Sequence, residues 1–127
     1  MSTGTVLVID DEELVRDVVE DTLRSEGITV SLAANGTEGI RLFRDHWREV
    51  GVVLLDLSMP GLSGEETYRL LREIDPSVKV IFSSGYSAND ALSMLPEGDT
   101  TNFIKKPYKG TSLVEMICRI MRSSTTA

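Results

Sequence analysis

The chain has 127 residues, of which 41% are hydrophobic, and this fits one domain, residues 1–127, with one sizeable core. Its net charge of -7, from 20 acidic and 13 basic residues, argues against contact with nucleic acid or with an anionic membrane. No apolar run approaches the roughly 20 residues that span a bilayer and no secretory signal is visible, so we expect a cytoplasmic protein.

The first third of the chain predicts a buried strand, a helix and an edge strand. Residues 6–9 are continuously apolar, which is typical of a parallel strand covered on both faces. A helix follows and ends at Gly27. The residues predicted to share its core face are Val15, Val18, Val19 and Leu23. Residues 28–33 alternate between apolar and polar side chains, so we expect a half-exposed strand at a sheet edge.

The middle of the chain repeats this alternation of strand and helix. An Asn35-Gly36 turn precedes a helix whose shared apolar face holds Ile40, Phe43 and Trp47. Residues 52–55 are continuously apolar and predict another buried strand. The next helix ends at Asp75-Pro76, and its shared face holds Thr67, Leu70, Leu71 and Ile74.

The last third predicts two more strands and two more helices. Residues 80–82 and 103–104 are short apolar strands, and residues 88–95 between them give the weakest helical pattern of the chain. The last helix has an apolar stripe of Leu113, Ile117, Ile120 and Met121. The single Cys118 excludes an internal disulfide and is expected to be a buried, inert thiol. A polar tail at residues 123–127 lies outside the expected core of residues 5–122.

Five βα units in succession predict an α/β fold. Right-handed crossovers place helices on both faces of a five-stranded parallel sheet. A doubly wound, flavodoxin-like sheet has the strand order 2-1-3-4-5. That order puts the second strand at an edge, in agreement with its alternating pattern.

Polar residues close four of the five predicted strands. Residues 10–12 (Asp-Asp-Glu) follow the first strand, Asp56 the third, residues 83–85 (Ser-Ser-Gly) the fourth, and Lys106 the fifth. All strands of a parallel sheet end on the same side, and ligands bind outside these ends where the strand order reverses. We therefore expect the carboxylates of residues 10, 11 and 56 to converge.

Carboxylates this close repel one another. Two charges ~4 Å apart repel by about 4 kcal/mol at an effective dielectric of about 20, and a hard divalent cation removes that penalty. Mg²⁺ prefers oxygen ligands and commonly binds through one or two carboxylates plus phosphate. Lys106 adds one positive charge suited to a phosphate or a carboxylate.

Each of these residues has a plainer interpretation when it is taken alone. The acidic pair can be a helix N-cap, Asp56 and Ser84 can be turn residues, and Lys106 can be solvated surface. Their joint placement at four strand ends favours the functional interpretation. His46 lies among charged residues on a helix, where we expect only a solvated face.

As a set, the motifs resemble the response-regulator receiver domain of the CheY-like superfamily. They are Val8-Ile9-Asp10-Asp11-Glu12, Leu55-Asp56-Leu57-Ser58-Met59-Pro60-Gly61 with Gly64, Ser84-Gly85, and Lys106-Pro107-Tyr108. The similarity covers residues 5–122. Residues 82–87 and 106–108 further resemble the receivers of hybrid sensor histidine kinases. That origin would make the chain a cytoplasmic domain of a membrane-bound kinase, and a stand-alone receiver is equally compatible.

The resemblance implies that Asp56 accepts a phosphoryl group from a phosphohistidine. The donor would be a sensor histidine kinase or a histidine phosphotransfer domain of a two-component phosphorelay. Asp11, Asp56 and the Ser58 backbone carbonyl would ligate Mg²⁺ directly, and Asp10 would act through water. Such a domain is not an enzyme for a separate substrate, because it catalyses only its own phosphorylation and dephosphorylation.

The resemblance also implies a switch. Ser84 and Lys106 would contact phosphoryl oxygens, and Phe103 would turn inward as Ser84 moves. The surface of the fourth helix, fifth strand and fifth helix would then change. Ser58 is too short to position water well and Tyr86 can cover the entrance, so we expect slow self-dephosphorylation unless Tyr86 points to solvent or to a partner.

Three other classes compete with this interpretation. A dehalogenase-like phosphatase expects Asp-x-Asp on one strand, whereas the acidic pair here is adjacent and Asp56 follows another strand. A flavodoxin-type FMN site needs a Ser, Thr and Gly-rich loop after the first strand, where residues 10–12 are acidic and would repel phosphate. A degenerate receiver that serves only protein contacts is disfavoured by the complete acidic set.

Overall fold

The computed structural model describes residues 4–85 and 102–123, and they build a parallel sheet with helices on both faces. The strands are β1 (Thr5–Ile9), β2 (Thr29–Ala33), β3 (Val50–Asp56), β4 (Val80–Ser84) and β5 (Phe103–Lys105). The helices are α1 (Glu13–Ser25), α2 (Gly36–His46), α3 (Gly64–Ile74) and α5 (Gly110–Ser123). The helix expected at residues 88–95 and the side chain of Tyr86 lie outside the described residues.

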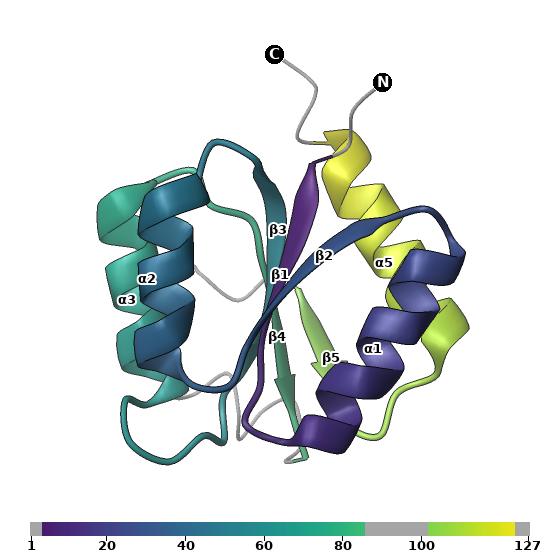
Figure 1. Ribbon diagram of the computed structural model, residues 1–127, viewed down its shortest axis with the longest axis horizontal. Coiled ribbons are helices and arrows are strands. Elements are labelled where there is room, and N and C mark those ends of the chain that lie inside the picture. The colour runs from purple at the N-terminus through teal and green to yellow at the C-terminus, as the bar shows by residue number, and fades with distance from the viewer. Residues whose placement is uncertain (1–3, 86–101, 124–127) are drawn as a thin grey trace.

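The sheet has the order β2-β1-β3-β4-β5, and every pair of neighbours is parallel (Figure 1). The predicted strand order and the edge position of β2 are therefore confirmed. In the register of the sheet, Ile9 of β1 lies opposite Leu55 of β3, and Asp56 lies opposite Ser83 of β4. This register brings the ends of β1, β3 and β4 to one edge of the sheet.

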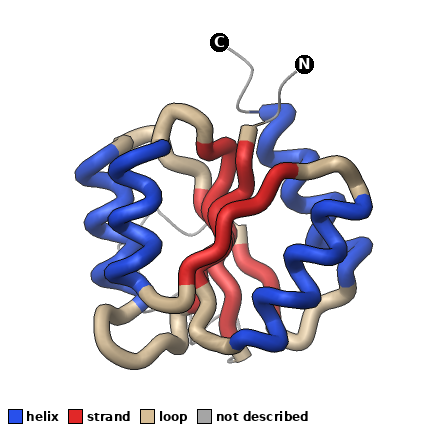
Figure 2. The backbone as a smooth tube through the Cα atoms, in the orientation of Figure 1, coloured by secondary structure: helices blue, strands red, loops and turns tan. Residues whose placement is uncertain are grey.

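Two apolar layers fill the space between sheet and helices. Helices α2 and α3 cover one face, and α1 and α5 cover the other (Figures 1 and 2). The first layer includes Leu7, Ile9, Phe43, Leu55, Leu71 and Phe82. The second includes Val8, Leu23, Leu54, Ile81, Leu113 and Ile117. Each large apolar side chain buried in this way stabilises the fold by about 1.5–3 kcal/mol, so the strand ends are held on a rigid support.

Helices α2 and α3 begin with side-chain caps. Asn35 accepts a hydrogen bond from the Glu38 backbone N–H at 2.8 Å. Ser63 and Glu66 form a reciprocal capping box at the start of α3. A cap of this kind contributes roughly 1 kcal/mol and fixes where the helix starts. The loops between the strand ends and these helices are thereby anchored at their far side.

Several apolar residues are less buried than the sequence patterns predicted. Val18 is 62% exposed, because it precedes Val19 by one residue and so points about 100° away from it around α1. Leu14, on the same flank of α1, is 78% exposed. Cys118 and Trp47 are each half-buried at the margin of a core layer, so the prediction of a buried thiol was wrong.

The prediction that His46 lies on a solvated face agrees with the structure. His46 is exposed and lies 3.2 Å from Glu49 on the solvated end of α2. Lys105 is exposed, since alternation along β5 turns it away from its neighbour. Among residues 4–85 and 102–123, no helix has the length and apolar character that crossing a membrane requires.

Candidate functional site

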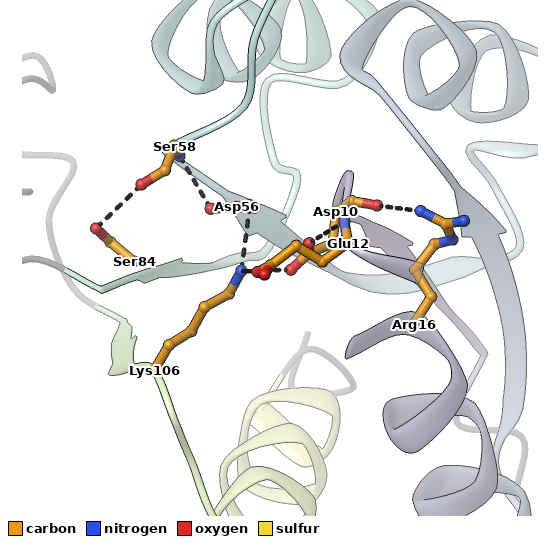
Figure 3. A network of polar contacts seen from close by, with 7 residues as sticks. All are labelled: Asp10, Glu12, Arg16, Asp56, Ser58, Ser84 and Lys106. Atoms are coloured by element: carbon orange, nitrogen blue, oxygen red, sulfur yellow. Dashed lines mark hydrogen bonds and ion pairs between the residues drawn. The ribbon is translucent and has the colours of Figure 1, made fainter. Parts of the chain in front are cut away.

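Four strand ends meet at one edge of the sheet and form the candidate site (Figure 3). Asp10 directly follows β1, Asp56 closes β3, Ser84 closes β4, and Lys106 directly follows β5. Each position is fixed by the buried strand before it, so the geometry of the sheet is also the geometry of the site. The four residues that the strand-end rule predicted lie together.

Three carboxylates gather at the ends of β1 and β3. One oxygen from each of Asp10, Asp11 and Asp56 lies within 4.8 Å of the other two. Asp10 and Asp56 are each only 2% exposed, whereas Asp11 is exposed at the rim. Two buried carboxylates side by side raise the free energy of the fold unless positive charge lies between them.

Lys106 supplies positive charge at this point (Figure 3). Its Nζ lies 2.8 Å from Asp10 Oδ2, 2.9 Å from Glu12 Oε1 and 3.2 Å from Asp56 Oδ2. Burial alone lowers the pKa of Lys106, but the hydrogen bonds to Asp10 and Glu12 and the charge of Asp56 outweigh burial and raise it. The ammonium is therefore fully charged at neutral pH.

The Asp56 carboxylate is held at both oxygens. Its Oδ1 accepts a hydrogen bond from the Ser58 backbone N–H at 2.9 Å, and its Oδ2 accepts one from Lys106 Nζ at 3.2 Å. Burial raises the pKa of Asp56 to about 6, with a smaller contribution from the charge of Asp10, and these effects exceed the lowering by Ser58 and Lys106. At neutral pH Asp56 is an ionised, buried and oriented carboxylate.

Backbone contacts hold the loop after β1 in place. Asp10 Oδ1 accepts a hydrogen bond from the Glu12 backbone N–H at 2.9 Å. The Asp10 backbone carbonyl accepts one from Arg16 Nη1 at 2.8 Å. The loop between β1 and α1 is therefore tied to the first turns of α1, and Asp10 has little freedom to move.

Ser84 lies on the side of Asp56 away from Asp10 (Figure 3), and its backbone carbonyl accepts a hydrogen bond from the Lys106 backbone N–H at 2.8 Å. Its side chain is fully buried, and its Oγ lies 3.5 Å from Ser58 Oγ. Phe103 is half-buried against the core layer that contains Phe82, and Phe82 in turn packs edge-to-face with Tyr68 at 4.9 Å between ring centroids. The switch roles of Ser84 and Phe103 stay predictions.

Two features near the site could not be predicted from the sequence, namely two side-chain contacts and two buried hydroxyls. The ion pair of Glu12 with Lys106 and the hydrogen bond from Arg16 to Asp10 depend on side-chain conformations that no spacing rule gives. Ser83 Oγ and the Tyr108 hydroxyl are buried without a hydrogen-bond partner within residues 4–85 and 102–123. Burial raises the pKa of Tyr108 to about 12, so its hydroxyl stays protonated at neutral pH.

An apolar groove of about 430 Å³ opens beside the site. It runs between the first turns of α1 and the loop after β5, and its lining residues are Glu12, Leu14, Val15, Val18, Val19, Lys106, Pro107 and Tyr108. Lys106 and Glu12 thus belong both to the groove and to the carboxylate site. Leu14 and Val18, the most exposed large apolar side chains within residues 4–85 and 102–123, line this groove.

The donor atoms of the site fit a hard divalent cation. All three clustered ligands are carboxylate oxygens, and Mg²⁺ prefers oxygen over nitrogen or sulfur. The three clustered carboxylates and Glu12 surround a single ammonium, that of Lys106. The site therefore has a net negative charge, and binding of a further cation is electrostatically favourable. The Ser58 backbone carbonyl stays a predicted ligand.

Comparison with known proteins gives consistent matches over nearly the whole chain. The family described as the response regulator receiver domain matches residues 6–118. The chain is 34% identical over 119 residues to the sensor kinase CckA of Brucella abortus (strain 2308), a match that covers 91% of this chain and 13% of that protein. It is 35% identical over 129 residues to the uncharacterized transcriptional regulatory protein YkoG of Bacillus subtilis (strain 168), and this match covers 99% of the chain and 54% of that protein. The chain thus spans about half, or far less, of these relatives.

Solved structures agree with these matches. A response regulator receiver domain protein from Clostridium thermocellum has a TM-score of 0.87 and 28% identity, with 95% of this chain and 96% of that chain covered. The receiver domain of the hybrid histidine kinase CckA has a TM-score of 0.79 and 27% identity, with 93% and 99% covered. The similar structures therefore include the receiver domain of a hybrid histidine kinase as well as a response regulator receiver domain protein.

Proposed function

Because this chain belongs to the response regulator receiver domain family of two-component signalling, we propose that Asp56 accepts a phosphoryl group from a phosphohistidine donor. The observation that carries the proposal is the Asp56 carboxylate itself. It closes β3 at the edge where four strand ends meet, it is 2% exposed, and both its oxygens are held. The family match favours this function over a dehalogenase-like phosphatase or an FMN site.

The reaction is a transfer between two nucleophiles. One oxygen of the Asp56 carboxylate attacks phosphorus, and the bond between phosphorus and the donor imidazole nitrogen breaks. The imidazole keeps the bonding electron pair, and Asp56 becomes an acyl phosphate. No proton has to leave Asp56, since its pKa of about 6 keeps it ionised at neutral pH. The protein therefore contributes positioning and charge more than acid–base chemistry.

Charge neutralisation comes from the residues around Asp56. We propose that Asp11, Asp56 and the Ser58 carbonyl hold Mg²⁺ directly and that Asp10 holds it through water. Bound there, Mg²⁺ supplies positive charge that lowers the repulsion between the carboxylates and the phosphoryl oxygens. Lys106 and the Ser84 hydroxyl donate hydrogen bonds to the remaining phosphoryl oxygens. The oxygen ligands and the buried ammonium described above support this assignment.

The signal leaves the site through Ser84 and Phe103. We propose that Ser84 moves toward the phosphoryl group and that Phe103 turns inward, which changes the surface of β5 and α5. Support comes from the sheet register, because Ser84 lies opposite Lys105 in β5, two residues from Phe103. Phe103 is half-buried and so has a core layer into which it can turn.

The partners proposed are a sensor histidine kinase or a histidine phosphotransfer domain. A donor protein has to bring its imidazole to Asp56, so it must cover the mouth of the site. The apolar groove beside that mouth, with Leu14 and Val18 exposed, supports docking of the donor over α1.

The test uses a small phosphodonor and intact-mass measurement. With acetyl phosphate and Mg²⁺, we expect the protein to gain one phosphoryl group, and without Mg²⁺ we expect almost none. Asp56→Asn keeps the shape and loses the nucleophile, so it should gain no mass. The matched control is Asp45→Asn on the exposed end of α2, which should react like the unchanged protein. A phosphoryl group on the Asp56→Asn protein at the same site would show that the assignment is wrong.

A further inference from the structure

Glu12 contacts the phosphorylation site in a way that no ligand role explains. Its Oε1 lies 2.9 Å from Lys106 Nζ, within 0.1 Å of the Asp10 distance of 2.8 Å, although the Glu12 side chain is 59% exposed. The two residues lie 94 positions apart in the chain. The contact therefore joins the loop after β1 to the loop after β5 across the mouth of the site (Figure 3).

The ammonium of Lys106 has no spare donor in this arrangement. A lysine side chain has three N–H donors, and Asp10, Glu12 and Asp56 each accept one. Lys106 can therefore donate to a phosphoryl oxygen only after one of these three hydrogen bonds breaks. Asp56 is the partner that phosphorylation releases, because its carboxylate loses its charge when it becomes an acyl phosphate. Its contact is also the longest, at 3.2 Å.

Of the three acceptors, Glu12 alone stands apart from the cation cluster. That cluster contains Asp10, Asp11 and Asp56. A cation bound there would weaken the attraction of Asp10 and Asp56 for Lys106, because it partly neutralises their charge. The Glu12 carboxylate keeps its full charge for Lys106. Of the three acceptors, Glu12 is thus the one that neither binds the cation nor becomes phosphorylated, so it stays available to Lys106.

The local backbone prepares Glu12 for this role. Glu12 is the N-cap residue of α1, and its side chain makes no capping hydrogen bond, so the carboxylate is free to extend to Lys106. Its backbone N–H is bound by Asp10 Oδ1 and its carbonyl accepts the Arg16 backbone N–H at 3.1 Å. The Glu12 backbone is therefore fixed by hydrogen bonds, and its side chain extends from this fixed position to Lys106.

We propose that Glu12 is a positioning residue for phosphoryl transfer, which keeps the Lys106 ammonium at the mouth of the site while Asp10 and Asp56 are engaged elsewhere. The inference rests on the proposed function of Asp56. Glu12 does not touch the reacting atoms, and it acts only through Lys106.

The first experiment needs no metal and no phosphodonor. Urea unfolding is measured with a chelator present for Glu12→Ala and for Glu13→Ala, each in the unchanged protein and in the Lys106→Ala protein. Glu13 is the neighbouring exposed acid and carries the same charge. Glu12→Ala should lower the urea midpoint more than Glu13→Ala, and this excess should vanish in the Lys106→Ala background. If the two substitutions lower the urea midpoint equally in both backgrounds, the contact between Glu12 and Lys106 does not stabilise the protein and the inference is wrong.

The second experiment measures the rate of mass gain from acetyl phosphate at saturating Mg²⁺. Glu12→Ala should slow the reaction by about three- to tenfold relative to Glu13→Ala, the scale of one partly exposed charge-assisted hydrogen bond. Glu12→Gln keeps an oxygen acceptor for Lys106 and should recover part of the rate. In the Lys106→Ala background, Glu12→Ala and Glu13→Ala should react alike.

The outcomes separate this inference from the proposed function. If the unchanged protein gains a phosphoryl group but Glu12→Ala reacts as fast as Glu13→Ala, the positioning role is wrong and Asp56 keeps its function. The same holds if the slowing persists without Lys106, since Glu12 would then act by another route. Absence of any mass gain in the unchanged protein overturns both.

Discussion

The Asp56 side chain shows how a residue proposed as the phosphoryl acceptor can be unfavourable for stability. Its carboxylate is buried beside Asp10, and burial raises its pKa from 3.8 to about 6. The charged form is therefore less stable in the folded protein than in the unfolded chain. A nucleophile oriented inside the protein carries this penalty at every pH above its pKa.

Removing that charge should stabilise the protein when no metal is present. At pH 7.5 we expect Asp56→Asn to raise the free energy of unfolding by about 1–2 kcal/mol, after allowance for solvent screening at the mouth of the site. Since the folded pKa lies above the unfolded value, the penalty is absent below pH 3.8, grows as the pH rises to about 6 and is complete above it.

The measurement is urea unfolding in the presence of a chelator at pH 4 and at pH 7.5. The stability gained by Asp56→Asn should be clearly smaller at pH 4. Asp45→Asn on the exposed end of α2 serves as the control and should change little at either pH. A gain that is the same at both pH values would mean that burial of the charge is not its source.

Helix α1 has two different apolar surfaces, and only one of them faces the core. Val19 and Leu23 are buried against the sheet, whereas Leu14 and Val18 lie on the flank beside the groove. The sequence pattern placed Val18 with the core residues because a residue three positions after Val15 satisfies helical spacing. Which edge of an apolar stripe stays exposed depends on how the helix sits on the sheet, and the sequence does not contain that information directly.

The exposed flank of α1 leads to a prediction that separates docking from chemistry. Leu14→Ser with Val18→Ser should slow transfer from a phosphorylated histidine phosphotransfer domain by about tenfold or more, since loss of two apolar contacts removes about 1.5–3 kcal/mol of binding. The donor domain used is one shown to phosphorylate the unchanged protein. The rate is followed by intact mass.

Acetyl phosphate provides the internal comparison for this variant. It needs no docking surface, so its reaction with the doubly substituted protein should be unchanged. Thr22→Ser, a small change on the same helix where it approaches α5, is the control for the helix itself. Equal slowing with both phosphodonors would point to damage at the site and would contradict docking on α1.

At the scale of the whole molecule, the topology explains why the site was predictable. Residues 10, 56, 84 and 106 are far apart in sequence, but parallel strands in the order 2-1-3-4-5 end at one edge. Reading the residue after each apolar run was therefore enough to assemble them. The Glu12 contact with Lys106 was not predictable, because both side chains are long and many rotamers satisfy the same backbone.

Mg²⁺ should stabilise the whole fold if the carboxylate cluster binds it. At a concentration ten times the dissociation constant, binding to the folded state alone adds about 1.4 kcal/mol. For a domain of this size the melting temperature should rise by about 5 °C. A melting curve unchanged by millimolar Mg²⁺ would contradict the metal site.

Asp11 gives the cleanest variant for this measurement. It belongs to the carboxylate cluster and is exposed, and it is not one of the three carboxylates that hold Lys106. Asp11→Ala should therefore leave the metal-free melting temperature nearly unchanged and remove most of the rise with Mg²⁺. Asp17→Ala, on the exposed surface of α1, should keep the full rise.

The path of the chain puts its entry and exit at the edge opposite to the site. Strand β1 starts and helix α5 finishes at the top of Figure 1, whereas the strand ends that form the candidate site lie at the bottom. The 14 residues of α5 separate the two edges by about 21 Å at about 1.5 Å per residue. A donor domain fused to this one must span that distance, and a flexible tether has this r.m.s. end-to-end distance at about 12–18 residues. Tether length would then set the local concentration of the donor at Asp56. A change in tether length alone could therefore favour transfer within one molecule or transfer between molecules, with both contact surfaces unchanged.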